Sequence, residues 1–402
     1  MAITDKKTGV WGLDQTYNKL NQGSIWNYVG ENKLFTWGQN EQGELGQNNT
    51  TDYSSPTQVG SDTNWGIISR GAARGSWHML ASKSDGTLWA WGEDYYGSLG
   101  QNSHVDYSSP IQIGSDTTWS TSGVGKLTCK RSMGSIKTDG TLWMWGYNAY
   151  GMLGQNDVAH RSSPAQIPGT TWKDIGGAGD DSVVAIKTDG TLWSWGNNDH
   201  GTLGQNNANP ARLSSPVQVG SDTTWSAVSK GGNIFGLATK TDGTLWSWGD
   251  NEEGNSTGVL GQNNRTTYSS PVQVGGTDWA TGADKIAASD RTAIVIKADG
   301  TIYSWGGGAS GQLGHGSETQ RSSPTQIGSA STWDTIAAGE THFIATKTDG
   351  TVWTWGDGGY GRLGRSSPGD NPAIVPVELP GTDWGTAQVA GSKRSGMAIK
   401  AK

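Results

Sequence analysis

Histidines, paired acids and a lone cysteine are the residues of this chain whose types could support catalysis or metal binding. Asp180-Asp181 and Glu252-Glu253 are adjacent acids, and neighbours on a strand point to opposite faces, whereas general acid–base catalysis needs converging carboxylates. Cys129 is the single cysteine, so it forms no internal disulfide. No metal-site spacing relates the six histidines, which are His78, His104, His160, His200, His315 and His342. The sequence therefore predicts no catalytic residue, metal or cofactor, and a protein that is not an enzyme.

A repeated unit must position whatever this chain binds. Seven Trp-Gly pairs recur at intervals of 54, 54, 50, 53, 57 and 50 residues. Their tryptophans are Trp37, Trp91, Trp145, Trp195, Trp248, Trp305 and Trp355. A period of this size indicates a repeat architecture, so function depends on what the units present together.

One unit contains four strand-sized runs. Residues 182–187 are β-branched, and the Asp189-Gly190 pair that follows is a hairpin signal before residues 192–195. Pro216 stands in the last run, which suits an edge strand. Four short strands in about fifty residues, without a helical period, predict the blades of a propeller.

The two ends of the chain complement each other. Trp384 to Lys400 supplies only the first two strands of a unit, and residues 33–59 supply the last two. The sequence predicts an all-β, closed seven-bladed propeller over residues 31–402, with one blade built from both termini and a short helical arm in residues 1–30. An open superhelix, which needs capping repeats, is the less favoured alternative.

The repeat resembles the regulator of chromosome condensation family. The resemblance rests on Ala338-Gly339, Asp349-Gly350, Trp353-Thr354-Trp355-Gly356 and Gly361-Arg362-Leu363-Gly364, with equivalents from about residue 31 to the end. It implies the propeller fold but decides little about function, because one fold serves many tasks.

The two faces of the disc differ in sequence. The second–third hairpins are nearly all Asp-Gly-Thr, whereas the first–second and third–fourth loops, which open on the other face, vary between units. Aromatic and charged residues on a rigid scaffold suit protein recognition, although exposed loops also vary freely. The candidate partner-binding residues are Trp77, His78, Tyr95, Tyr96, Lys130, Arg131, Tyr150, Asp180, Asp181, His200, Phe235, Glu252, Glu253, Arg291, His342, Tyr360, Lys393 and Arg394.

The segment before the repeats offers a candidate attachment arm. Leu13, Tyr17 and Leu20 form one apolar stripe of a short amphipathic helix, which packs either on the propeller or on another chain. Together with Trp11 and Trp26, this segment is similar to leaders of structural proteins in marine bacteriophages. That resemblance implies attachment to a particle.

These observations favour a non-catalytic binding or structural propeller, displayed on a phage tail or capsid and contacting a host surface component or a neighbouring virion protein. A homo-oligomer is an open possibility. The net charge of −7 and the absence of a basic stripe argue against nucleic-acid binding, and no signal peptide or membrane span is expected. One alternative is a guanine-nucleotide exchange factor, for which the family resemblance implicates Asp180-Asp181 and Thr341-His342. Another is a propeller-type inhibitor of an enzyme.

Overall fold

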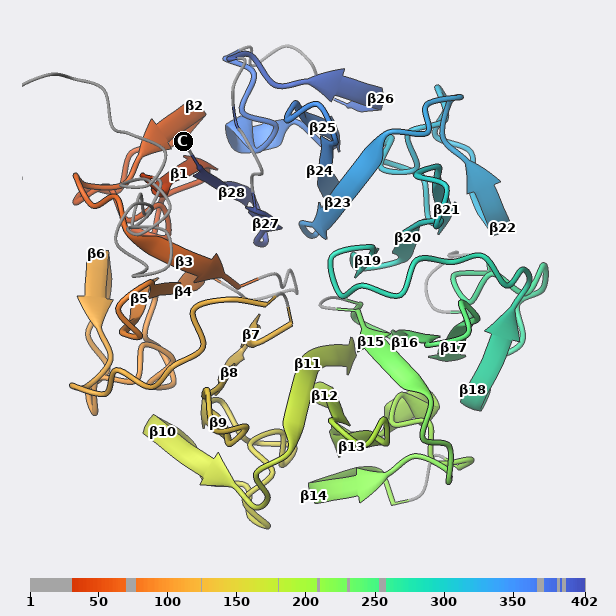
Figure 1. The fold of residues 1–402 in the computed structure, drawn as a ribbon, viewed down its shortest axis with the longest axis horizontal. Helices are drawn as coiled ribbons and strands as arrows, with labels where there is room; N and C mark the ends of the chain where they lie inside the picture. The colour runs from red at the N-terminus through yellow and green to blue at the C-terminus, as the bar shows by residue number, and fades with distance from the viewer. Residues whose placement is uncertain are drawn as a thin grey trace, which may run out of the picture.

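The computed structural model describes residues 31–69, 77–123, 125–179, 181–207, 210–229, 232–252, 258–366, 372–381, 384 and 388–401. Within these residues the strands form seven four-stranded sheets, arranged as blades around a central axis (Figure 1). The first strand of each blade lies innermost and the fourth lies at the rim. The predicted seven-bladed all-β propeller is confirmed.

Each blade is an antiparallel sheet, and in six of the seven described blades the strands follow chain order from the axis outward. The strands of blades 1 to 3 are β3 (Trp65–Ile68), β4 (His78–Lys83), β5 (Leu88–Gly92), β6 (Tyr107–Gln112); β7 (Leu127–Cys129), β8 (Ser132–Ile136), β9 (Leu142–Gly146), β10 (Arg161–Ile167); and β11 (Trp172–Gly179), β12 (Ser182–Lys187), β13 (Leu192–Asn197), β14 (Arg212–Gln218). Those of blades 4 to 6 are β15 (Trp225–Val228), β16 (Phe235–Lys240), β17 (Leu245–Gly249), β18 (Tyr268–Val274); β19 (Ile286–Ala288), β20 (Thr292–Ile296), β21 (Ile302–Gly306), β22 (Arg321–Gln326); and β23 (Trp333–Ala338), β24 (His342–Lys347), β25 (Val352–Gly356), β26 (Ala373–Glu378). Short 3-10 turns, η1 (Asp199–Gly201) and η3 (Gly359–Gly361), lie in third–fourth loops.

Blade 7 joins the two ends of the chain. Its strands are β27 (Gln388–Gly391), β28 (Ser395–Lys400), β1 (Lys33–Gly38) and β2 (Tyr53–Gln58). β28 and β1 pair without a break, from Lys33 opposite Lys400 to Gly38 opposite Ser395. This register confirms the predicted shared blade, and it removes the free edges that an open array would carry.

The Trp-Gly tryptophans fasten each blade to the one before it. Their side chains are completely buried, and each removes roughly 150–250 Å² from water. Each indole Nε1 donates to a backbone carbonyl of the preceding blade at 2.8–2.9 Å. The seven pairs are Trp91–Glu44, Trp145–Ser98, Trp195–Met152, Trp248–Thr202, Trp305–Val259, Trp355–Gln312 and Trp37–Arg362. The ring of bonds is therefore closed.

The Gly-x-Leu-Gly motif follows from this contact. Gly100 has a φ of +69°, and a Cβ there would lie 3.0 Å from the Trp145 Nε1. Both the left-handed backbone and the neighbouring indole therefore require glycine.

The uniform hairpins are built by a local hydrogen-bond relay. The Asp189 carboxylate accepts from the Thr191 N–H at 3.0 Å and from its hydroxyl at 2.7 Å. The Thr191 hydroxyl in turn accepts from the Trp193 indole at 2.8 Å. These bonds lower the pKa of Asp189. The carboxylate therefore stays ionised, and the turn that it holds stays intact, at neutral pH. Asp-Gly-Thr thus recurs for a structural reason.

Residues 1–30, with the predicted arm and its residues Trp11, Leu13, Tyr17, Leu20 and Trp26, lie outside the described residues. No helix in the described part of the chain is long and apolar enough to span a membrane.

Candidate functional site

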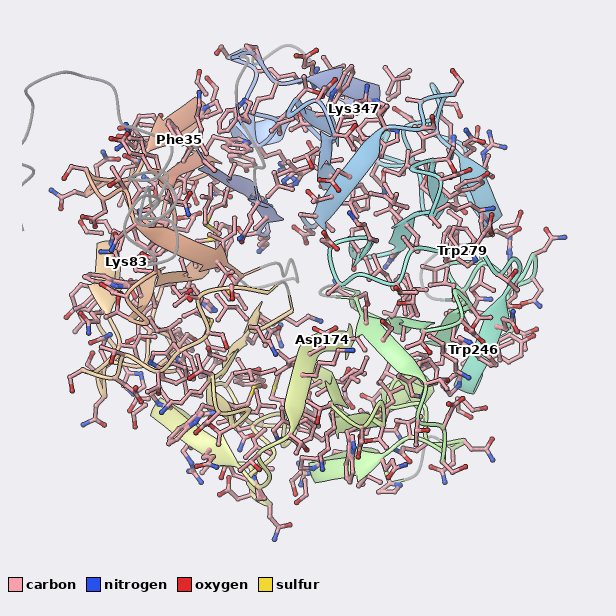
Figure 2. The ribbon with its side chains drawn as sticks, viewed as in Figure 1. Phe35, Lys83, Asp174, Trp246, Trp279 and Lys347 are labelled. Atoms are coloured by element: carbon pink, nitrogen blue, oxygen red, sulfur yellow. The ribbon has the colours of Figure 1, made fainter. Side chains whose placement is uncertain are left out.

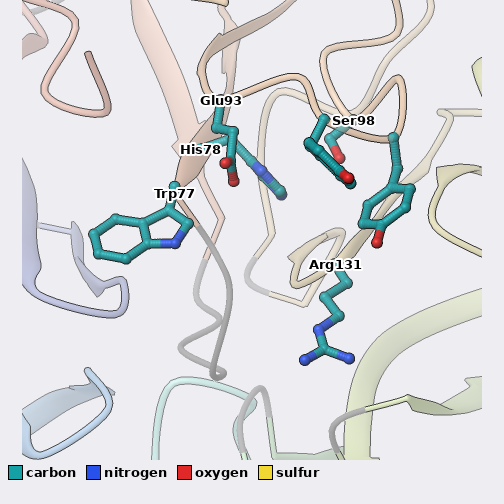
Figure 3. A pocket seen from close by; sticks show the side chains of 7 residues that line it. Trp77, His78, Glu93, Ser98 and Arg131 are labelled. Atoms are coloured by element: carbon teal, nitrogen blue, oxygen red, sulfur yellow. The ribbon is translucent and has the colours of Figure 1, made fainter. Parts of the chain in front are cut away.

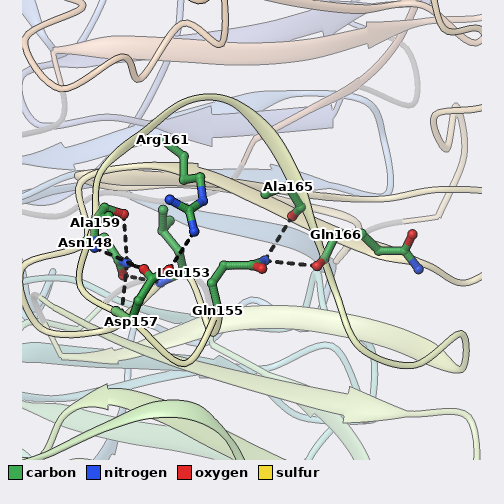
Figure 4. A network of polar contacts seen from close by, with 8 residues as sticks. All are labelled: Asn148, Leu153, Gln155, Asp157, Ala159, Arg161, Ala165 and Gln166. Carbon is green, nitrogen blue, oxygen red and sulfur yellow. Dashed lines mark hydrogen bonds and ion pairs between the residues drawn. The ribbon is translucent and has the colours of Figure 1, made fainter.

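The third–fourth loops of blades 1 and 2 carry several tyrosines, and in blade 2 a polar network fixes the loop backbone (Figure 4). In blade 2 the Asn148 Oδ1 accepts from the Leu153 N–H at 2.8 Å, and its Nδ2 donates to the carbonyls of Asp157 and Ala159 at 3.2 and 2.9 Å. The Gln155 amide donates to a carbonyl of strand β10 at 3.0 Å. The blade 2 loop is therefore a rigid support for exposed side chains.

Aromatic rings from the two loops meet at the boundary between blades 1 and 2. The ring of Tyr96 lies 4.6 Å from that of Tyr147 and 5.0 Å from that of His160. Tyr147 stacks on His160 at 5.1 Å, and Tyr95 packs edge-on against Tyr96 at 4.6 Å. Tyr150 completes the group at 6.4 Å from Tyr147. Such contacts add about 0.5–1.5 kcal/mol per pair beyond area burial.

His160 occupies a position that a carboxylate holds in neighbouring blades. Its Nδ1 accepts the backbone N–H of Asn148 at 2.8 Å, so the neutral ring carries its proton on Nε2. Asp52 and Asp106 accept the equivalent N–H in blades 7 and 1, each at 2.7 Å. The exchange of Asp for His keeps the loop closed and adds a ring to the tyrosine group.

An open hollow of about 350 Å³ lies beside these rings (Figure 3). Trp77 and Glu93 form one side, while Ser98 and Arg131 lie across from them. Burial and the nearby Asp106 carboxylate raise the pKa of Glu93. The hollow is lined by Trp77, His78, Glu93, Tyr95, Tyr96, Ser98 and Arg131, from first–second and third–fourth loops alike. Both kinds of loop therefore open on one face, which we call the loop face.

Cations extend the group toward blades 7 and 6. The Lys393 Nζ lies 4.1 Å from the centre of the Trp77 ring, within cation–π range. The Arg394 guanidinium lies 5.7 Å from the same ring and 4.7 Å from that of Tyr360. Aromatic residues of blades 6, 1 and 2 thus form an arc, in which Arg394 of blade 7 bridges Tyr360 and Trp77. We define it as Trp77, Tyr95, Tyr96, Tyr147, Tyr150, His160 and Tyr360.

Arg131 bounds the other end of the arc. Its guanidinium lies 5.7 Å from the Tyr147 ring and pairs with the Asp181 carboxylate at 3.4 Å. Asp181 is largely buried, and this burial raises its pKa, although the charges of Arg131 and Lys130 oppose the rise. The pair joins blades 2 and 3 on the loop face.

Besides Asp181, four predicted contact residues have side chains inside the molecule. His78 and Lys130 are 3 % exposed, whereas Phe235 and His342 are fully buried. The His78 Nε2 donates to the Lys130 carbonyl at 2.6 Å, and the Lys130 Nζ donates to the Gly232 carbonyl at 3.0 Å. Burial lowers the pKa of His78 to about 4 and that of His342 to about 3. These residues position the inner loops and do not offer their side chains to a partner.

The remaining predicted residues lie away from the arc. The exposed His200 ring is 3.4 Å from the Asp250 carboxylate, and Glu252 is also exposed, both in the third–fourth loops of blades 3 and 4. Arg291 belongs to the inner loop of blade 5 and lies 3.8 Å from Asp290. Asp180 and Glu253 lie outside the described residues.

Four members of this site were not among the predicted residues, and one of them is Ser98, which lines the hollow. The other three are Tyr147, Glu93 and His160, which contribute to the arc or its hollow. Tyr147 and Glu93 directly follow a Trp-Gly pair, where the other units carry different polar residues or glycine. A column-by-column comparison of the units would have revealed this variable position.

The chemistry of this surface is that of recognition. Across the described ranges, no group of three or more His, Cys, Asp or Glu side chains could hold a metal ion. Large aromatic rings beside arginines and lysines are typical of binding hot spots.

Family models match nearly all of the repeat region. The RCC1-like domain model matches residues 28–334, well over half of the chain. The chain belongs to the RCC1-like domain family. Two further models, both of the regulator of chromosome condensation (RCC1) repeat, match residues 333–362 and 349–399.

Known members of this family differ widely in size. The chain is 26% identical to the ultraviolet-B receptor UVR8 of Arabidopsis thaliana over 302 residues, which are 75% of this chain and 55% of the receptor. It is also 26% identical to the human E3 ubiquitin-protein ligase HERC2 over 74% of this chain and 5% of the ligase. The chain therefore spans about half the length of one relative and a small part of the other.

A solved structure shows the same fold. Prp20p from Saccharomyces cerevisiae, described with its binding properties to Gsp1p and histones, superposes with a TM-score of 0.78. The sequences are 19% identical, and the match covers 93% of this chain and 92% of that one. This likeness concerns the fold of the propeller.

Proposed function

We propose that this protein is a non-catalytic binding propeller that recognises another protein through the aromatic arc. The family membership supports a protein-interaction propeller in general terms. The arc specifies which surface makes the contact. It combines tyrosine and tryptophan, which bind with little loss of side-chain entropy, with arginine and lysine.

One observation carries this proposal. The most exposed large apolar side chains of the described residues include three aromatic ones, Tyr95, Tyr150 and Tyr360, which are 70%, 36% and 46% exposed. All three lie in the arc. The others are valines, of which Val105 and Val158 belong to the same third–fourth loops of blades 1 and 2, and Val217 and Val375 to the rim strands β14 and β26. Exposed rings concentrated on one face of a rigid body indicate a contact surface.

A partner should depend on the arc and on nothing at the rim. The full chain is used to enrich binding proteins from extracts of its source, and each purified candidate is then titrated by calorimetry. Tyr95→Ala and Tyr360→Ala should each weaken binding about tenfold or more, the effect of losing about 1.4 kcal/mol or more. The matched control is Val217→Ala, because Val217 is 38% exposed on β14 at the rim. A purified partner whose affinity is unchanged in both tyrosine variants contradicts the proposal.

Guanine-nucleotide exchange is a second candidate, and the fold shared with Prp20p over 93% of this chain favours it. Two of the residues that the family resemblance implicates are held internally. Asp181 pairs with Arg131, and His342 is fully buried. Release of labelled guanine nucleotide from a panel of small GTPases tests this activity. If the wild type accelerates nucleotide release and the Tyr95→Ala variant does so equally, the result would favour exchange activity that does not use the arc.

Display on a phage particle is the finer part of the first proposal, and it rests on the resemblance of residues 1–30 alone. A chain truncated before Glu31 should keep the propeller and lose association with particles. Equal association of the truncated and full chains would refute attachment through the arm while leaving the arc untouched.

A further inference from the structure

A lysine lies over two aromatic rings at the junctions between blades, near the rim. In blade 3 the Lys187 Nζ lies 3.8 Å from the Trp193 ring and 4.9 Å from the Trp172 ring. In blade 4 the Lys240 Nζ lies 3.9 and 4.8 Å from the equivalent rings. Figure 2 labels further members of this set, Lys83 and Lys347, in other blades around the ring. The repeats thus supply internal controls for one another.

Four of these lysines also hold a carboxylate from the segment that leads into their own blade. Lys83 pairs with Asp62 at 2.8 Å, and Lys297 pairs with Asp278 at 3.0 Å. Further pairs of this kind are Lys137–Asp116 and Lys240–Asp222. In these four blades an anion therefore covers the outer side of the ammonium group.

Lys187 differs, because no carboxylate of the described residues forms an ion pair with it. The reason is a single residue. Pro168-Gly169-Thr170-Thr171-Trp172 has the same length as Gly275-Gly276-Thr277-Asp278-Trp279, and Thr171 stands where the other segment carries Asp278. The backbones of the two segments match as well. The Thr171 carbonyl accepts the N–H of Thr188 at 2.8 Å, and the Asp278 carbonyl accepts that of Ala298, the equivalent residue, at 2.9 Å. The position of the acid is thus preserved while the acid itself is replaced.

An open hollow of about 330 Å³ lies beside Lys187. Its walls include the rings of Trp172 and Trp193 and the side chains of Gln155, Asn156 and Gln166. The Gln155 amide already donates to carbonyls of β10, so the donors left for a ligand are the Lys187 ammonium group and the amides of Asn156 and Gln166. These groups bind a carboxylate, and indole rings accept the adjoining carbon skeleton. Lys347 also has no carboxylate partner among the described residues. Lys187 is the stronger candidate for a binding site because it lines a hollow.

We propose that this hollow is a binding site for a small organic acid, whose carboxylate takes the place that Asp278 occupies in blade 5. The site shares no lining residue with the aromatic arc or its hollow, and it does not depend on the function proposed above. The shared chemistry is one carboxylate on a molecule of amino-acid or monosaccharide size.

Two probes distinguish the sources of that carboxylate. The full chain is titrated with N-acetylglutamate N-methylamide and with glucuronate, and with their uncharged counterparts N-acetylglutamine N-methylamide and glucose. The indole N–H resonance of Trp193, assigned with Trp193→Phe, reports occupancy. At least one acid should shift it with a dissociation constant on the order of 1 mM, and its neutral counterpart should not. The acid that binds identifies the source.

Matched variants locate the site. Thr171→Asp installs the carboxylate that Asp278 provides in blade 5, and it should lower the affinity for the acidic probe about tenfold or more. Lys187→Met should have the same effect. Lys297→Met alters a lysine that is already paired and should leave the titration unchanged. Asp278→Thr should create a second site, seen as a new shift of the Trp279 indole. The proposal is overturned if neither acid shifts Trp193, if the neutral counterpart shifts it equally, or if Thr171→Asp binds like the wild type.

Discussion

Asp94 should make the stability of this propeller depend on pH in a direction that one substitution reverses. Its blade 2 counterpart, Asn148, both accepts and donates within its loop. Asp94 keeps the acceptor bond, from the Leu99 N–H at 2.8 Å, but its Oδ2 is buried and has no hydrogen-bond partner. An ionised carboxylate therefore occupies a site built for an amide.

The size of the effect follows from the raised pKa. Burial chiefly, with help from the Asp106 carboxylate, raises the pKa of Asp94 from 3.8 to about 6. At about 1.4 kcal/mol per pKa unit, the ionised form lowers the free energy of unfolding by at most about 3 kcal/mol at neutral pH. The folded state binds the proton more tightly than the unfolded state. Stability is therefore lost as the pH rises from about 4 to 6, and the penalty is absent below that window.

Asp94→Asn should remove this penalty and restore the donor. We expect a higher melting temperature at pH 8, by about 3–4 °C for one cooperative unit at about 2 cal/mol/K per residue. The gain should shrink steadily toward pH 4, and Asn148→Asp, the matched control, should lower the melting temperature at pH 8. Calorimetry across this range measures both. A gain that is the same at pH 4.5 and pH 8, or a loss at pH 8, refutes the reasoning.

Three further predictions concern the contacts between blades. Gly100→Ala should lower the free energy of unfolding in urea by about 1–3 kcal/mol more than Gly114→Ala does. Both glycines have positive φ, but only Gly100 has an indole against it. Equal losses in the two variants would show that the indole contact is unimportant. Trp37→Phe should lower the free energy of unfolding by about 2–4 kcal/mol, because it leaves the buried Arg362 carbonyl without its donor and opens a gap. An unchanged denaturation midpoint would contradict this closing role. The pKa of His78 is lowered to about 4, so its unfolded form takes up a proton below about pH 6.5 and stability falls with acid. His78→Gln should therefore lose less stability than the wild type between pH 7 and 5, and an equal loss would rule out His78 as the cause.

The architecture could be predicted because its determinants are local and repeated. Trp-Gly spacing, Asp-Gly turns and complementary half-units at the ends are visible in the printed sequence, and each has one structural solution in a ring. The register of Lys33 opposite Lys400 follows from that logic. The reason for Gly100 does not, since the indole that requires glycine comes from a tryptophan 45 residues later in the chain, Trp145.

The site was predicted less completely, because it depends on how neighbouring blades meet. The second strand begins one residue earlier than the loops suggested, so His78, Phe235 and His342 are already inside the sheets. Conversely, Tyr147 and His160 reach the surface beside rings of another blade. Pairing between loops some fifty residues apart is set by tertiary packing, which no local pattern encodes.

The shared seventh blade has a consequence for biosynthesis. The strand containing Lys33 leaves the ribosome long before its hydrogen-bonding neighbour at Lys400 is translated. Until then, the nascent protein exposes one unpaired strand edge at each end of an incomplete circle, a state prone to self-association. Translation of β28, and not the completion of any earlier blade, is therefore the step that allows these two strand edges to pair with each other.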